Sequence, residues 1–217
     1  MNPNFWLARW ENNHLGWHLE QAHPMLVSHL GKIADTPETC IFIPLCGKTL
    51  DIEWLLTQGY RVAGAELSEI AVGQMFEIAD IVPEVTDLGK VKRYSAPRVD
   101  IFVGNIFDLT QEALGPVDVV FDRAALVALP KEMRQRYALH LTALVKQAPQ
   151  VLVSFDYDQN AMAGPPFSVP HEEINDLYQD SYAISLLSDE NMPDGLKGIC
   201  PAREQTWMLT AQQHTQD

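Results

Sequence analysis

The stretch that decides the fold reads Ile41-Phe42-Ile43-Pro44-Leu45-Cys46-Gly47-Lys48-Thr49-Leu50-Asp51. Its apolar beginning predicts a buried strand, and Gly47 predicts a tight turn. The apolar spacing of Ile52, Leu55 and Leu56 then predicts a helix. In an open α/β sheet, ligands lie outside the carboxyl ends of the strands. The segment therefore predicts a ligand-binding first crossover.

The rest of the chain repeats this alternation of short β-branched runs and longer segments of helical period. Such alternation is typical of an α/β fold built on a mostly parallel sheet with crossover helices. Seven strands are predicted, at residues 40–44, 61–66, 100–104, 117–122, 151–156, 182–187 and 206–210. Ser68 and Glu69 are placed to begin the helix after the second strand.

The charge and cysteine content exclude several classes of partner. The chain has 15 Lys and Arg against 29 Asp and Glu, a net charge of −14, which opposes binding to nucleic acid or anionic membranes. Three widely spaced cysteines form no metal-binding pattern and predict free thiols in a reducing, cytoplasmic compartment. The sequence contains no run of about 18 apolar residues, so no membrane span is predicted.

An acidic residue follows the glycine turn at the distance that nucleoside-binding folds use. Glu66 ends the second strand, 19 residues after Gly47, where a carboxylate commonly accepts hydrogen bonds from ribose hydroxyls. The GxGxxG pattern that lets a backbone approach a pyrophosphate is missing from this turn. A nucleoside without phosphates therefore fits better than a dinucleotide. The alternative is that Gly47 only turns the chain and Glu66 is a surface charge.

Polar residues also follow the third and fourth strands. Asn105 and Asp108 are placed to read an adenine edge, or they serve only as a turn or helix cap. Arg123 directly follows the fourth strand, where a guanidinium can hold a carboxylate or steer an anionic substrate, or form a structural ion pair. Because no HExxH, GxSxG or P-loop pattern is found, no metal site or other catalytic group is predicted.

Several separated blocks, in order and at matching spacing, resemble the thiopurine S-methyltransferase family. They are IFIPLCGKTLDIEWLLTQGYRVAGAELSE, GNIFDL, FDRAALVALP and SFDYDQNAMAGPPFSVPHEEI. The resemblance implies the seven-stranded class I methyltransferase (Rossmann-like) fold, with helices on both faces of the sheet and an N-terminal helical cover. It also implies S-adenosylmethionine as methyl donor and S-adenosylhomocysteine as product.

The resemblance implies roles for individual residues. Contacts to S-adenosylmethionine are expected from Trp10, Leu45, Gly47, Glu66, Asn105, Ile106 and Arg123. The substrate side is expected to include Trp17 and Arg123, and Arg123 is the candidate for steering a thiolate. The implied acceptors are thiopurines and other aromatic or heterocyclic thiols, with selenium and tellurium compounds as further candidates.

The expected organisation is a single methyltransferase domain over 1–217. Residues 1–35 form the N-terminal cover, 40–160 the cofactor-binding sheet core, and 161–211 a substrate-side loop and the last strands. The absence of heptads and repeats favours a monomer. Two other functions stay open: a non-catalytic sensor of S-adenosylmethionine or S-adenosylhomocysteine, and a nicotinamide dehydrogenase, which the missing GxGxxG disfavours.

Overall fold

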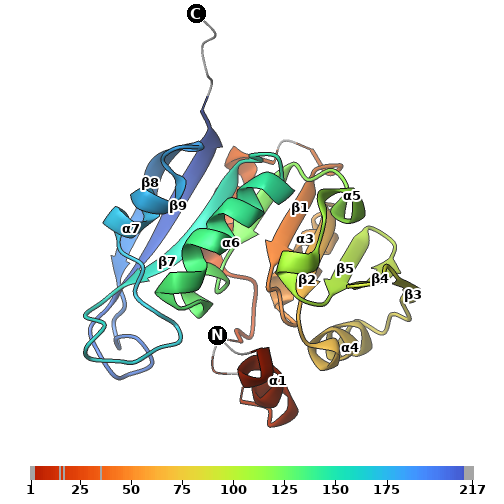
Figure 1. Ribbon diagram of the computed structural model, residues 1–217, viewed down its shortest axis with the longest axis horizontal. Helices are drawn as coiled ribbons and strands as arrows, with labels where there is room; N and C mark the ends of the chain where they lie inside the picture. Colours follow the sequence, from red (N-terminus) through yellow and green to blue (C-terminus); the bar gives the residue numbers. More distant parts are fainter. Residues whose placement is uncertain (1–2, 15, 17, 35, 213–217) are drawn as a thin grey trace, which may run out of the picture. The chain divides into compact units, whose positions relative to one another are not determined.

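The computed structural model describes residues 3–14, 16, 18–34 and 36–212. The chain divides into two compact units, residues 1–121 and 122–217. Figure 1 shows the helices and strands of both units in the colours of the sequence.

The first unit carries a mixed set of strands in the order β3-β4-β5-β2-β1-β6. Strands β1, β2, β5 and β6 run parallel, whereas β3 and β4 are antiparallel to their neighbours. The bounds are β1 Cys40–Pro44, β2 Arg61–Glu66, β3 Glu84–Asp87, β4 Lys92–Ala96, β5 Val99–Val103 and β6 Val119–Asp122.

The helices of this unit follow the predicted crossovers. They are α1 Pro3–Glu11, α2 Pro24–His29, α3 Leu50–Thr57, α4 Glu69–Ile78 and α5 Gln111–Leu114, with short 3₁₀ turns η1 Leu30–Lys32 and η2 Ile106–Asp108. Thr49 and Ser68 cap α3 and α4 with their side-chain oxygens. Helices α3 and α4 pack against β2, and α1 lies beside α4 (Figure 1).

The second unit contains three strands in the order β7-β9-β8, and β9 runs antiparallel to both β7 and β8. The bounds are η3 Leu126–Ala128, α6 Lys131–Leu144, β7 Gln150–Asp156, α7 His171–Tyr178, β8 Tyr182–Asn191 and β9 Arg203–Ala211. Helix α7 contacts α6 and lies beside β8 (Figure 1). Residues 161–170 form neither helix nor strand, as their prolines predict.

The prediction of an α/β fold is confirmed, but the described residues form nine strands rather than seven. The strand arrangement is mixed: β1, β2, β5 and β6 pair in parallel, whereas β3, β4, β8 and β9 pair antiparallel. The two additional strands are β3 and β4, a hairpin at the end of the strand order. Their sequences, EVTD and KRYSA, carry charges, and none of their residues is buried. Strands without buried residues need no continuous apolar run, so hydrophobic patterning misses them.

Candidate cofactor-binding site

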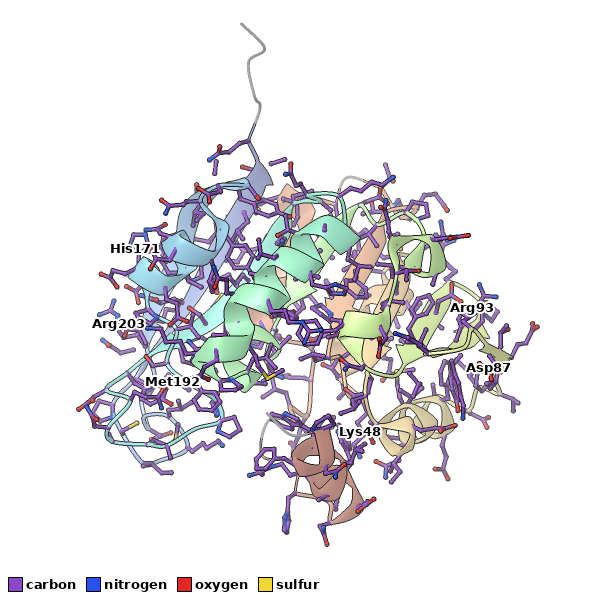
Figure 2. The ribbon with its side chains drawn as sticks, viewed as in Figure 1. Lys48, Asp87, Arg93, His171, Met192 and Arg203 are labelled. Carbon is purple, nitrogen blue, oxygen red and sulfur yellow. The ribbon has the colours of Figure 1, made fainter. Side chains whose placement is uncertain are left out.

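The carboxyl ends of three parallel strands of the first unit bring the predicted site residues together. In the strand register Pro44 is level with Ala65, and Glu66 is level with Val103. The residues that follow β1, end β2 and follow β5 therefore share one edge. These residues are Leu45, Gly47, Glu66, Asn105 and Ile106. Lys48 follows Gly47 in the same turn and is drawn next to α1 (Figure 2).

Glu66 is the centre of this edge. Its side chain is only 6% exposed, and its two carboxylate oxygens accept hydrogen bonds from the amides of Gly47 and Ser68, each at 2.8 Å. Burial raises the pKa of Glu66, and the hydrogen bonds from backbone amides act against that rise. The carboxylate thus ties the turn after β1 to the turn that begins α4.

The turn after β1 has a backbone that few residues adopt. Leu45 and Gly47 have positive φ angles of 49° and 56°. A Cβ atom built on Gly47 would lie 2.9 Å from Cζ2 of Trp10, so the indole packs directly on the glycine. Trp10 is itself buried. The absence of a side chain at Gly47 thus allows α1 to cover the turn.

Asn105 and Ile106 lie just after β5. The residue before them, Gly104, donates its amide hydrogen to the carbonyl oxygen of Glu66 at 2.8 Å. The Asn105 side chain caps η2, because its Oδ1 accepts from the Phe107 amide at 3.1 Å. Ile106 is buried. The capping alternative for Asn105 is therefore present in the structure. Asp108 is in an ion pair with Lys90.

Sequence reasoning missed a second anchor of the N-terminal segment. The amide of His23 donates to Asp51 Oδ1 at 2.7 Å, and Thr49 Oγ1 donates to Asp51 Oδ2 at 2.7 Å. Asp51 and His23 are both buried. An acidic residue in the first turn of a helix is usual and gives no signal of such a long-range bond. Trp17, the predicted substrate-side aromatic residue, lies outside the described residues.

Arg123 is found in the second unit, at the residue after β6. It is partly buried, and Ala124, which follows it, has a positive φ angle of 65°. Asp122, at the end of β6, is fully buried, and its carboxylate accepts from the Tyr137 hydroxyl at 2.7 Å and the Leu126 amide at 3.1 Å. Sequence reasoning identified Arg123 as a candidate site residue, but it did not reveal the bond between Asp122 and Tyr137.

The first-unit edge has the chemistry that a nucleoside requires. A carboxylate offers about four lone-pair positions; on Glu66 the amides of Gly47 and Ser68 use two, and the backbone of Leu67 also donates to it. The remaining position can accept a hydrogen bond from a ribose hydroxyl. The indole of Trp10 occupies the space beside Gly47 where a Cβ would lie. In a glycine-rich phosphate site that space is left open for the phosphate. The residues therefore fit the nucleoside part of S-adenosylmethionine.

Other kinds of site have less support. Cys40, Cys46 and Cys200 are all buried and free. Burial raises the pKa of the Cys46 thiol well above its usual range, so this thiol is a poor nucleophile. Among the described residues, no group of three or more His, Cys, Asp or Glu side chains is placed to hold a metal. Within the same residues no helix is long and apolar enough to span a membrane.

Comparisons with solved structures agree with this fold. A Burkholderia thailandensis 1,6-didemethyltoxoflavin-N1-methyltransferase superimposes with a TM-score of 0.64 at 16% identity, covering 96% of this chain and 87% of that one. An S-adenosylmethionine-dependent methyltransferase from Methanosarcina mazei gives a TM-score of 0.64 at 14% identity, covering 89% of this chain and 100% of the other. The predicted methyltransferase fold is thereby confirmed.

Sequence comparisons identify the family. The family model described as thiopurine S-methyltransferase matches residues 1–211. A thiopurine S-methyltransferase from Xanthobacter autotrophicus is 54% identical over 210 residues, which are 96% of this chain and 99% of that protein. One from Gluconobacter oxydans is 44% identical, with 96% and 95% covered. The chain therefore belongs to the thiopurine S-methyltransferase family and is an S-adenosylmethionine-dependent methyltransferase.

Proposed function

We propose that this chain methylates the sulfur of thiopurines or other aromatic and heterocyclic thiols. The observation that carries the proposal is the buried Glu66 carboxylate beside the Gly47 turn, which supports a bound nucleoside cofactor. The acceptor class is supported by the relatives from Xanthobacter autotrophicus and Gluconobacter oxydans, both named thiopurine S-methyltransferases.

The cofactor contacts that we propose follow from the chemistry of each residue. Glu66 accepts a hydrogen bond from a ribose hydroxyl, and the backbone at Leu45 and Gly47 lies against the nucleoside. The indole of Trp10 is suited to a cationic sulfonium, since aromatic faces attract cations.

The remaining proposed contacts come from two separated segments. Asn105 and Ile106 read the adenine edge. Oδ1 of Asn105 already accepts the hydrogen bond that caps η2. The side-chain nitrogen Nδ2 is therefore the atom that can donate to adenine. Arg123 holds the cofactor carboxylate, for which a guanidinium has matching geometry.

The reaction is an in-line displacement. Bound S-adenosylmethionine would supply a methyl group on a positively charged sulfur. A thiolate acceptor, whose proton has passed to solvent, would bond to that methyl carbon as the carbon–sulfur bond to the cofactor breaks, and the bonding electrons would stay on the sulfur of S-adenosylhomocysteine. The contribution of the chain is to hold the two reactants end to end and to exclude water. Arg123 also favours the thiolate form of the acceptor, and Trp17 lines the acceptor side. No protein nucleophile is needed.

We also propose that selenium and tellurium compounds are acceptors, since their anions are softer nucleophiles than thiolates. The net charge of −14 supports a small-molecule partner rather than nucleic acid. We further propose a cytoplasmic monomer. The three buried free cysteines support a reducing compartment.

A comparison of matched acceptors tests the proposal. Labelled S-adenosylmethionine is incubated with the protein and either 6-mercaptopurine or hypoxanthine, which carries oxygen in place of sulfur. We expect label on the sulfur of 6-mercaptopurine and none on hypoxanthine. If a wide panel of thiols gives cofactor binding without methyl transfer, the chain is instead a sensor of S-adenosylmethionine or S-adenosylhomocysteine.

A further inference from the structure

A tight turn in the second unit joins Asp122, the end of β6, to η3 and carries Arg123. Arg123 and Ala124 are partly exposed, whereas Ala125 and Leu126 are fully buried. Ala124 has a φ angle of 65°, a conformation that a residue with a side chain seldom adopts. Something must therefore hold this turn in place.

The carboxylate of Asp122 closes the turn from inside. Its Oδ1 accepts from the amide of Leu126 at 3.1 Å, and the backbone of Ala125 also donates to this carboxylate. The fully buried side chain of Asp122, the first residue of the turn, thus binds the last two residues of the turn, Ala125 and Leu126. Arg123 and Ala124, between these residues, are held at both ends.

Tyr137 fixes the orientation of that carboxylate. Its hydroxyl donates to Asp122 Oδ2 at 2.7 Å from the buried face of α6. Burial raises the pKa of Asp122 to about 6, and the hydrogen bond from Tyr137 acts against that rise. The carboxylate is therefore mostly charged at pH 7.5, when both of its oxygens act as acceptors.

The far side of the turn is held as well. The carbonyl of Val127, within η3, accepts from the amide of Phe167 at 2.7 Å. Arg134 on α6 donates to Leu129 O at 2.9 Å, so the chain directly after η3 is also bound. The main chain around Arg123 is thus constrained from three directions.

From this geometry we propose that Asp122 is a positioning residue, oriented by Tyr137, which holds the turn that presents Arg123 to the ligand. The inference rests on the proposed function, in which Arg123 holds the cofactor carboxylate. In this role the fully buried Asp122 acts through the backbone turn, whose position determines where the Arg123 side chain starts.

A double-mutant cycle with S-adenosylhomocysteine tests the inference. Tyr137→Phe removes only the hydroxyl that orients Asp122 and is milder than any change of the buried carboxylate. The Kd for S-adenosylhomocysteine is measured by calorimetry for wild type, Tyr137→Phe, Arg123→Ala and the double variant. We expect Tyr137→Phe to weaken binding about 3- to 10-fold in the wild type but less than about 2-fold in the Arg123→Ala background.

Tyr178→Phe is the matched control. Tyr178 is equally buried, and its hydroxyl has no hydrogen-bond partner within the described residues. It should change the Kd less than about 2-fold in both backgrounds. Thermal unfolding of each variant confirms that the protein is folded at the temperature of the titration.

Equal weakening by Tyr137→Phe in both backgrounds would overturn the inference, because the hydroxyl would then act independently of Arg123. An unchanged Kd in Arg123→Ala would overturn it too, since there would be no contact to position. Failure of the proposed function looks different: the wild type would bind S-adenosylhomocysteine but methylate no thiol, and the binding cycle would still decide the role of Asp122.

Discussion

At the scale of single residues, Gly47 combines a conformational and a packing requirement. Its φ angle is 56°, and a Cβ there would lie 2.9 Å from the Trp10 ring. We expect Gly47→Ala to cost about 1 to 2 kcal/mol of unfolding free energy from the backbone alone, and to displace Trp10. Chemical unfolding, with tryptophan fluorescence as the probe, measures both effects.

Gly73→Ala is the control for that change. Gly73 lies within α4, and no atom is within 4 Å of the Cβ it would gain. Because alanine is favoured over glycine inside a helix, this variant should be about 0.5 to 1 kcal/mol more stable than wild type. If the two alanine variants changed stability equally, the packing role of Gly47 would be wrong.

The sequence allowed Gly47 and Glu66 to be paired, because a glycine turn and a carboxylate 19 residues later have a known geometric relation. It did not reveal that the Glu66 side chain accepts from the Gly47 amide itself. The bond from His23 to Asp51 is equally hidden, since 28 residues separate its partners and neither forms a motif. Contacts of this kind depend on tertiary packing.

At the scale of elements, Arg134 binds the proline-containing loop to α6. Its guanidinium forms an ion pair with Glu173 at 2.8 Å, donates to Ser168 O at 3.0 Å, and lies 5.7 Å from the Phe167 ring centroid. The residue is only 3% exposed. Arg134→Ala should lower the unfolding free energy by about 3 kcal/mol, because Glu173 and two carbonyls lose their partner.

Denaturant titration measures this loss, and Gln135→Ala is its control. Gln135 is the next residue of α6 and is exposed. Its removal should change stability by less than about 0.5 kcal/mol. A similarly small effect of Arg134→Ala would mean that the loop is held by other contacts.

The buried carboxylate of Asp122 predicts a pH dependence of stability. Its pKa rises from 3.8 to about 6 in the folded protein, mainly through burial. The protonated form is favoured on folding, so this stabilising contribution is complete below pH 3.8 and is lost as the pH rises through 6. Relative to Asp122→Asn, the wild type should gain on the order of 2 to 3 kcal/mol between pH 7.5 and pH 4.

Unfolding free energies of both proteins across that pH range test the prediction. Other groups titrate equally in the two proteins, so the difference between them isolates Asp122. A difference that does not vary with pH would contradict a raised pKa at this carboxyl.

Elements were predictable to different degrees. The parallel strands β1, β2, β5 and β6 were found because they are buried on both faces and read as continuous apolar runs. The hairpin of β3 and β4 was missed, because its strands are held by main-chain pairing and by contacts such as Tyr94 stacked on Phe76. Such strands have little hydrophobic signal.

At the scale of the whole molecule, the single-domain monomer stays a prediction. We expect one cooperative unfolding transition in calorimetry and a sedimentation mass near 24.4 kDa. Two separate transitions would mean that residues 1–121 and 122–217 unfold as independent domains. A mass near twice the chain mass would contradict the monomer.

The fold was predictable from the alternation of apolar runs and helical periods, and the methyl donor from the resemblance of several separated blocks to a known family. The acceptor was less accessible, since no single motif in the sequence specifies the shape of a substrate pocket. The proposed contact between Glu66 and the cofactor can be tested directly.

The central measurement is methyl transfer to 6-mercaptopurine across a range of S-adenosylmethionine concentrations, for wild type and Glu66→Ala. We expect turnover by the wild type and a cofactor KM raised roughly 10- to 100-fold in Glu66→Ala, because hydrogen bonds to a carboxylate are lost. Glu69→Ala removes an exposed carboxylate three residues away and should leave the KM unchanged. An unchanged KM in Glu66→Ala, or no turnover by the wild type, would contradict the account.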